Sequence, residues 1–186
     1  MNNNFTDYVL YLDTETTSLD PNKGFAFQLA YYGLKNGNLL FYNNLYMRPE
    51  NIEDFEFDEK GFEKHGVTKD EIKKFPLEKE QMRIFFKDLN SVDSKFLIAG
   101  YHIAFDIEFL KAIYCRNNFV FNNFYKLHYD VMQNAIGKSV EGKIKVPNFK
   151  LETMVDYFGI KFEGVAHNAL YDAGVTMLLS QKLENL

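Results

Sequence analysis

Three apolar stretches near the start of the chain predict three β-strands. They cover residues 8–12, 27–34 and 39–47. The segment KNGN, residues 35–38, separates the second from the third, and its Asn-Gly pair is typical of a tight hairpin turn. Pro49 follows, and because proline has no amide hydrogen to donate, we expect it to end this unit. At least two of the three predicted strands are therefore antiparallel.

Apolar residues at helical spacing dominate the rest of the chain, interrupted by two short apolar runs that predict further strands, residues 96–99 and 124–128. Thr68 is followed three residues later by Glu71, as in a capping box, so we expect a helix to begin at Thr68. Helices or helical turns are predicted over residues 59–65, 68–73, 77–89, 106–116, 131–136, 151–158 and 169–183.

This order of elements predicts an α/β fold with a central mixed five-stranded sheet flanked by helices. Length and composition agree, because 186 residues, 46% of them apolar, can bury one sizeable core. No repeat, linker or low-complexity stretch divides the sequence. We therefore expect residues 1–186 to form a single domain.

Net charge and cysteine content narrow the class of protein. The formal net charge of −5 argues against a broad electrostatic footprint for long nucleic acids. It is compatible with a nuclease, because a site rich in carboxylates is acidic until cations bind.

The single cysteine, Cys115, falls in a helical pattern and is expected to be a core thiol in a reducing compartment. With no signal peptide or membrane-spanning run in the sequence, we expect a soluble, cytoplasmic protein without a membrane partner.

One segment carries the opposite charge. Residues 138–150 contain four lysines and one glutamate. Such a segment is either a solvated loop or a contact for a phosphate backbone, and the residues alone leave both interpretations open.

Asp13 and Glu15 directly follow the first predicted strand. Side chains alternate between the faces of a strand at about 3.3 Å per residue, so these carboxylates point the same way, roughly 6 to 7 Å apart. Like charges at that separation repel each other, and a divalent cation between them would relieve the repulsion. The plainer interpretation, two solvated loop carboxylates, holds for most isolated Asp-x-Glu pairs.

Two more acids and a histidine reduce the weight of that interpretation. Asp106, in GYHIAFDIEFL, follows a strand and opens a helix, which places it at the carboxyl edge of the sheet, where ligands bind in open sheets. Asp172, in HNALYDAGVTMLL, lies beside Ala169 and Ala173, small residues that let a helix approach a sheet closely. His167 precedes Asp172 by five residues, about 140° around a helix. We therefore expect His167 in the loop or first turn, free to act as a general base.

The segments LDTETTSLDP, GYHIAFDIEFL and HNALYDAG, in this order, resemble the three exonuclease motifs of the DEDDh 3'-5' exonucleases. This family includes bacterial polymerase proofreading subunits, ribonuclease T and oligoribonuclease. EKHGVTKDEI resembles the family's His-Gly-Ile/Val-Thr segment, and FKLETMVDYFGI resembles the helix before its last motif. The resemblance covers nearly the whole chain, is closest to the proofreading exonuclease domains, and implies a ribonuclease H-like fold.

The resemblance also implies an activity. The enzyme would release nucleoside 5'-monophosphates from the 3' end of DNA, at single-stranded or frayed ends. Two Mg²⁺ ions, replaceable by Mn²⁺, would be held by Asp13, Glu15, Asp106 and Asp172, with Asp13 bridging them. His167 would accept the proton of the attacking water. The implied partners are nucleic acid with a free 3' end and, for proofreading, a DNA polymerase.

Substrate contacts are expected in the turn after the first motif and on one aromatic ring. The turn would offer backbone donors and a wedge beside the terminal base, and the ring would stack on a base unless it belongs to the core. These residues are Thr16, Thr17, Ser18, Leu19 and Phe105. Ser18 stands where the family usually has Gly, and Tyr101-His102 stand where it commonly has His-Asn, so the chain departs from the family in its fit to substrate. We expect His102 to be structural.

Two other functions stay open at this point. One is RNA trimming, as in ribonuclease T or oligoribonuclease. It stays open because no feature of the sequence recognises the 2'-hydroxyl that distinguishes RNA from DNA. A non-catalytic module that grips a polymerase or a nucleic-acid end is the other. Loss of one acidic ligand would be its usual signature, and all four acids are present. The oligomeric state does not follow from the residues.

Overall fold

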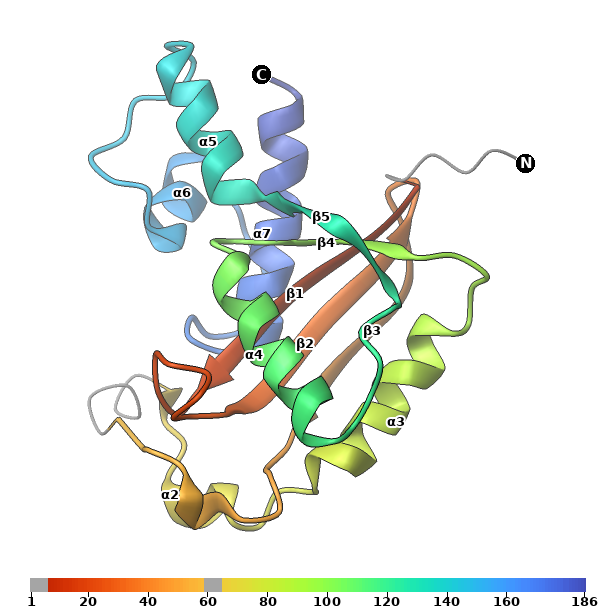
Figure 1. Ribbon diagram of the computed structural model, residues 1–186. Helices are drawn as coiled ribbons and strands as arrows, with labels where there is room; N and C mark the ends of the chain where they lie inside the picture. The colour runs from red at the N-terminus through yellow and green to blue at the C-terminus, as the bar shows by residue number, and fades with distance from the viewer. Residues whose placement is uncertain (1–6, 59–64) are drawn as a thin grey trace.

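The computed structural model describes residues 7–58 and 65–186, and the strands of this part form one mixed β-sheet. The strands are β1 (Tyr8–Thr16), β2 (Ala26–Lys35), β3 (Asn38–Tyr46), β4 (Phe96–Gly100) and β5 (Phe124–Asp130). Their order in space is β3-β2-β1-β4-β5. β2 runs antiparallel to β1 and β3, whereas β1, β4 and β5 are parallel (Figure 1). The mixed five-stranded sheet predicted from the sequence is confirmed.

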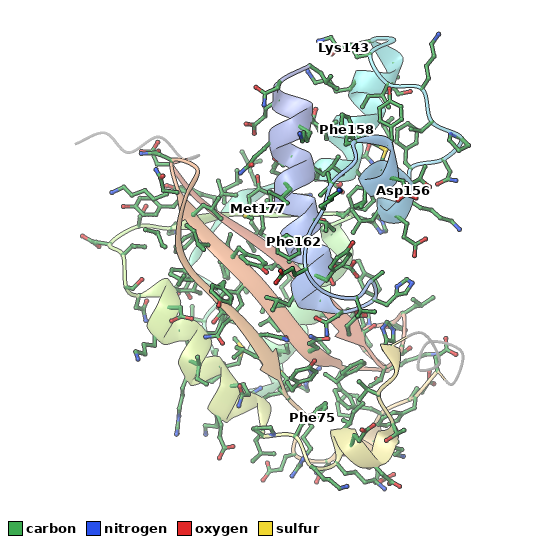
Figure 2. The ribbon with its side chains drawn as sticks, turned by 180° about the vertical axis from the view of Figure 1, so that it is seen from behind. Phe75, Lys143, Asp156, Phe158, Phe162 and Met177 are labelled. Carbon is green, nitrogen blue, oxygen red and sulfur yellow. The ribbon has the colours of Figure 1, made fainter. Side chains whose placement is uncertain are left out.

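Helices cover both faces of the sheet. The helical elements are η1 (Ile52–Asp54, a 3-10 helix), α2 (Lys69–Ile72), α3 (Glu78–Leu89), α4 (Ala104–Arg116), α5 (Val131–Val140), α6 (Leu151–Tyr157) and α7 (Ala169–Glu184). α3 and α4 pack on one face through a core rich in aromatic rings, among them Phe85, Phe109 and Tyr114. α5, α6 and α7 cover the other face, which Figure 2 shows from the side of α7. No helix within the described residues is long and apolar enough to cross a bilayer.

Two local predictions from the sequence are confirmed, the hairpin turn between β2 and β3 and the N-terminal cap of α2. Asn36 and Gly37 both have positive φ angles, 49° and 78°, as a two-residue hairpin of the primed type requires. Thr68 caps α2, because its backbone N–H donates to Glu71 Oε2 at 2.7 Å and its Oγ1 accepts from the Glu71 N–H at 3.3 Å. The helical turn predicted over 59–65 lies, apart from its last residue, outside the described residues.

β1 is four residues longer than the apolar pattern predicted. Pairing with β2 continues past Leu12, with Asp13 opposite Ala30 and Glu15 opposite Gln28. The carboxylates therefore lie on the strand itself and not in a loop after it, which fixes the directions of their side chains. Backbone pairing extends the strand here, and an apolar pattern cannot reveal it.

Cys115 was expected in the core, and this prediction was wrong. Its thiol is free and the residue is exposed. α4 buries Ile107, Leu110, Ile113 and Tyr114 against the sheet, and Cys115 falls on the solvent side of the same helix. Its position one residue after the last buried ring turns it away from the core.

Gly100 lets the turn between β4 and α4 lie close against β1. A Cβ atom added at this position would lie 2.8 Å from the backbone oxygen of Leu12 and 2.4 Å from Ile103 Cδ1. Any larger residue would push α4 outward, because the backbone oxygen cannot move aside. Glycine therefore helps to set the position from which Asp106 approaches β1.

Candidate active site

Three carboxylates from two elements meet near the carboxyl end of β1. Asp13 and Glu15 project from the same face of this strand, and Asp172 lies in the first turn of α7, which packs against it. One oxygen from each of these carboxylates lies within 4.8 Å of the other two. The structure thus brings together three of the four acids that the sequence singled out.

The fourth acid, Asp106, lies in the first turn of α4 beside this cluster. Thr14, between the two acids of β1, donates its backbone N–H and its hydroxyl to Asp106 Oδ1, at 2.9 and 2.7 Å. Only 3% of Asp106 is exposed. Hydrogen bonds from the strand that carries Asp13 therefore hold the Asp106 side chain in one orientation.

Burial and the repulsion between neighbouring charges make the ionised state costly for Asp13, Asp106 and Asp172. Burial raises the pKa of Asp13 well above its usual value, and the charges of Asp106, Glu15 and Asp172 raise it further. Burial also raises the pKa of Asp106 to about 7, although the hydrogen bonds from Thr14 oppose the shift. The pKa of Asp172 rises to about 7 through burial and the charge of Glu15. For all three acids, burial and neighbouring negative charge outweigh the groups that stabilise the ionised carboxylate.

Divalent cations would supply that compensation. Carboxylate oxygens are the ligands that Mg²⁺ and Mn²⁺ prefer, and a cation bound among them would favour their ionised form. The acids within 4.8 Å of one another, Asp13, Glu15 and Asp172, offer oxygen donors from a strand and a helix that pack together. The donor set, together with the raised pKa values of Asp13 and Asp172, thus fits a divalent metal site.

His167 lies outside the helix that carries Asp172, as predicted. It precedes Asn168, whose side chain caps α7 by accepting from the Leu170 N–H, and its φ angle is 63°. The imidazole is 45% exposed, and its Nε2 lies 3.2 Å from Glu152 Oε1. The ring is therefore accessible to solvent and borders the carboxylate cluster.

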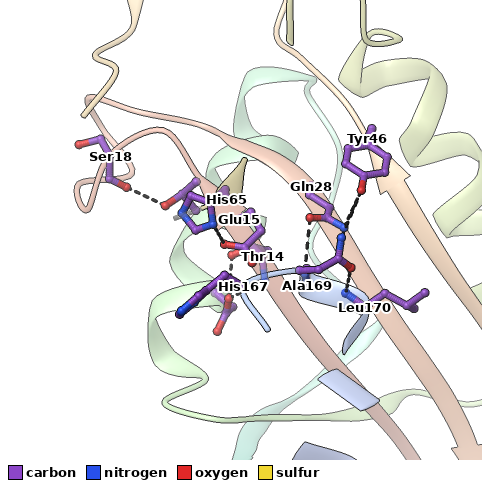
Figure 3. Close-up of polar contacts among 12 residues, drawn as sticks. Thr14, Glu15, Ser18, Gln28, Tyr46, His65, His167, Ala169 and Leu170 are labelled. Atoms are coloured by element: carbon purple, nitrogen blue, oxygen red, sulfur yellow. Dashed lines mark hydrogen bonds and ion pairs between the residues drawn. The ribbon is translucent and has the colours of Figure 1, made fainter. Parts of the chain in front are cut away.

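His65 is a site residue that the sequence did not single out. Its Nδ1 lies 2.7 Å from Glu15 Oε2, and its ring centroid lies 6.4 Å from that of His167 (Figure 3). The only available signal was its place in EKHGVTKDEI, a segment that resembles one in the family. Contact between positions 15 and 65 depends on tertiary structure, which residue patterns do not give.

A buried glutamine fixes the start of α7. Gln28, on β2, is 2% exposed, and its Oε1 accepts from the backbone N–H of Ala169 at 3.4 Å. Its Nε2 donates to Asn44 Oδ1 and to the Tyr46 hydroxyl, and Asn168 Nδ2 donates to the same hydroxyl. Figure 3 shows Gln28 with Tyr46 of the sheet and Ala169 of the helix. These contacts link β2 and β3 to the turn that presents Asp172.

The turn after the first motif divides into a structural part and an exposed part. Thr17 is 1% exposed, and its N–H and Oγ1 are both used in hydrogen bonds to the backbone of Phe25. The Thr17 backbone donor expected for substrate is therefore occupied. Thr16 Oγ1 donates to the carbonyl of Ser18 at 2.9 Å. Leu19 is 79% exposed, so it is accessible to a ligand.

The other expected contact residues lie around α4. Phe105 is half-buried, and its ring centroid lies 4.9 Å from that of Phe109, which is fully buried and belongs to the core. His102 is exposed with a φ angle of 58°, and its backbone N–H donates to Asp130 Oδ1 at 3.2 Å. A stacking role for Phe105 stays a prediction.

A hollow of about 360 Å³ opens beside the cluster. It is lined by Lys150, Leu151, Glu152, Ala166, His167 and Asp172. A larger cavity, of about 580 Å³, lies between the sheet and the last turns of α7, and none of the four acids lines it. The smaller hollow is the one that adjoins the groups able to do chemistry, so we take it as part of the candidate site.

Comparison with known proteins agrees with this geometry. A family model described as "Exonuclease" (RNase_T) matches residues 10–179. None of the curated proteins compared with the chain matches it.

Solved structures of exonuclease I share the fold. The zinc-bound E. coli ExoI–ssDNA complex superposes with a TM-score of 0.81 at 20% identity, over 97% of this chain and 41% of that one. Exonuclease I in its apo form gives 0.80 at 19% identity, over 97% and 42%. The SSB/exonuclease I complex with the inhibitor CFAM gives 0.80 at 18%, over 97% and 42%. The chain thus spans about two-fifths of the length of these proteins.

Proposed function

The chain belongs to the exonuclease family whose model matches residues 10–179, and from this premise we propose that it removes nucleotides one by one from the 3' end of single-stranded DNA. The observation that carries the proposal is the convergence of Asp13, Glu15 and Asp172, with Asp106 beside them. Single-stranded DNA is proposed as substrate because related folds were solved with it, among them an ExoI complex with a dA16 oligonucleotide.

Each acid has a proposed task. Asp13, Glu15 and Asp172 would hold one divalent cation, and Asp13 together with Asp106 would hold a second, with Mg²⁺ as the expected ion and Mn²⁺ as a substitute. When bound, such cations supply Lewis-acid activation of water and neutralise charge on the phosphate. His167, exposed at the rim of the cluster, accepts the proton that the attacking water loses.

The residues proposed to contact the substrate come from the turn after β1 and from one aromatic ring of α4. Leu19 lies against the terminal base, Thr16 and Ser18 shape the turn that supports it, and Phe105 stacks on a neighbouring base. Residues 1–186 are proposed to act as one catalytic domain. A proofreading role beside a DNA polymerase and a cytoplasmic location stay predictions.

The polarity of digestion tests the proposed function. Single strands of DNA and of RNA, labelled at the 5' end, are incubated with the protein in Mg²⁺, in Mn²⁺ and in EDTA. We expect a ladder of DNA products that shorten from the 3' end in either metal, and intact DNA in EDTA.

Matched controls make the outcome decisive. Asp13→Asn keeps the size of the side chain and removes its charge, so this variant should leave the strand intact. Digestion by Asp13→Asn at the wild-type rate would contradict the assignment of the site. Faster digestion of RNA than of DNA would replace single-stranded DNA by RNA as the substrate.

A further inference from the structure

The connection between α5 and α6 presents lysines on one side only. Ile144 is 1% exposed, and Val146 and Phe149 pack against the core on the α7 side of the sheet. The residues that alternate with them are exposed. We call the three exposed lysines Lys143, Lys145 and Lys150 the basic strip.

Polar contacts hold this connection in place. The carbonyl of Ile144 accepts from Ser139 Oγ at 3.1 Å, and the carbonyl of Phe149 accepts from the Tyr101 hydroxyl. Asn148 Oδ1 accepts from the Lys150 N–H at 3.0 Å, which fixes the chain at the start of α6. The lysines of the basic strip therefore project from a segment that hydrogen bonds hold in place. Figure 2 labels Lys143, at the end of this segment nearer to α5.

One end of the basic strip reaches the candidate site. Lys150 lines the same hollow as His167 and Asp172. Lys143 is paired with Glu141 at 3.2 Å, whereas within residues 7–58 and 65–186 neither Lys145 nor Lys150 forms an ion pair. These two ammonium groups are thus available to an anionic ligand, in a protein whose net charge is −5.

We propose that the basic strip binds the phosphate backbone of the substrate strand on the 5' side of the bond that is cut. The proposal rests on the proposed function. A strand whose 3' end lies among four carboxylates meets local negative charge, and lysines that lead away from the site offset it. The strip identifies the substrate as a strand several nucleotides long, held by its phosphates without regard to sequence.

The salt dependence of digestion tests the proposal. Each phosphate contact to a single strand contributes a slope of about −0.7 to the plot of log affinity against log salt concentration. Under subsaturating conditions kcat/KM for oligo(dT) should follow the same law. The double variant Lys145→Gln/Lys150→Gln is expected to reduce the magnitude of the slope by about 1.4. Lys145→Arg/Lys150→Arg should restore it, because arginine keeps the charge.

Two controls separate an effect of the basic strip from a general effect of lost charge or of misfolding. Lys79→Gln/Lys87→Gln removes the same charge from α3, on the other face of the sheet, and should leave the slope unchanged. Thermal unfolding of each variant verifies that it is folded.

A dinucleotide substrate separates the two proposals. The ratio of kcat/KM for oligo(dT) to that for a dinucleotide should fall at least several-fold in the glutamine variant of the strip. If the glutamine variant digests the dinucleotide and matches the wild type in both the slope and this ratio, the proposed role of the basic strip is overturned and the proposed function stands. If the wild type digests neither substrate in either metal, both are overturned.

Discussion

At the scale of single residues, two histidines in similar backbone conformations differ in what they border. His102 and His167 both have left-handed φ angles, 58° and 63°, and both are exposed. His167 lines the hollow that also contains Asp172, whereas the backbone of His102 contacts Asp130, the N-cap of α5. The pair therefore offers a matched test of the general base.

Replacing each histidine by asparagine should affect activity at only one position. Asparagine tolerates the left-handed conformation, so both variants should fold. His167→Asn is expected to lower kcat about 10²- to 10⁴-fold with little change in KM, the usual range for a lost general base. His102→Asn should retain wild-type kcat. Steady-state kinetics on oligo(dT) measure both, and equal losses in the two variants would contradict the role of His167.

The acids of the site could be predicted from residues alone, but their partners could not. Asp13, Glu15, Asp106 and Asp172 stand in short segments that carry their own signal. The contacts Thr14–Asp106 and His65–Glu15 join positions far apart in the chain. No local pattern encodes such pairs, because tertiary folding creates them.

At the scale of elements, the first turn of α7 depends on β2. Gln28 is the link, since its amide contacts the N–H of Ala169 and two polar groups of β3. The apolar pattern predicted both strand and helix but not this polar contact, because a lone glutamine in an apolar strand carries no signal of its partner. Small residues at Ala169 and Ala173, both buried, did indicate close packing of the helix.

Gln28→Leu should weaken the fold and the site together. Leucine fills similar space but leaves buried polar groups unpaired, at a cost of about 1–3 kcal/mol in the free energy of unfolding. Asp172 would lose its fixed position, so activity should fall in parallel. Chemical denaturation and initial rates measure both effects. Gln181→Leu, at an exposed position of the same helix as Asp172, should change stability by no more than about 0.5 kcal/mol; a loss as large as that of Gln28→Leu would contradict the proposed link.

At the scale of the whole molecule, the acidic cluster lowers stability in the absence of metal. The pKa values of Asp106 and Asp172 rise to about 7 from a usual value of 3.8. Between these values the folded chain binds more protons than the unfolded chain, so stability falls as pH rises. The ionised carboxylates therefore lower the free energy of unfolding, and bound cations would restore part of it.

Thermal unfolding across pH tests this cost. In EDTA, the Tm of the wild type is expected to fall as pH rises from about 4 to about 7, and Asp106→Asn/Asp172→Asn should flatten the decline. Added Mg²⁺ should raise the Tm of the wild type most at the upper end of this range, where the carboxylates bind it best. A Tm that is independent of pH and of Mg²⁺ would show that the cluster carries no uncompensated charge.

The release of a 3'-terminal label tests the central claim most directly. A single DNA strand labelled in its last nucleotide is mixed with the protein in Mg²⁺ or Mn²⁺, and the labelled products are separated over time. We predict that the label appears first as a nucleoside 5'-monophosphate, without a lag, and that EDTA or Asp172→Asn abolishes its release. Label that appears first in longer fragments, or that is released without metal, would contradict the account.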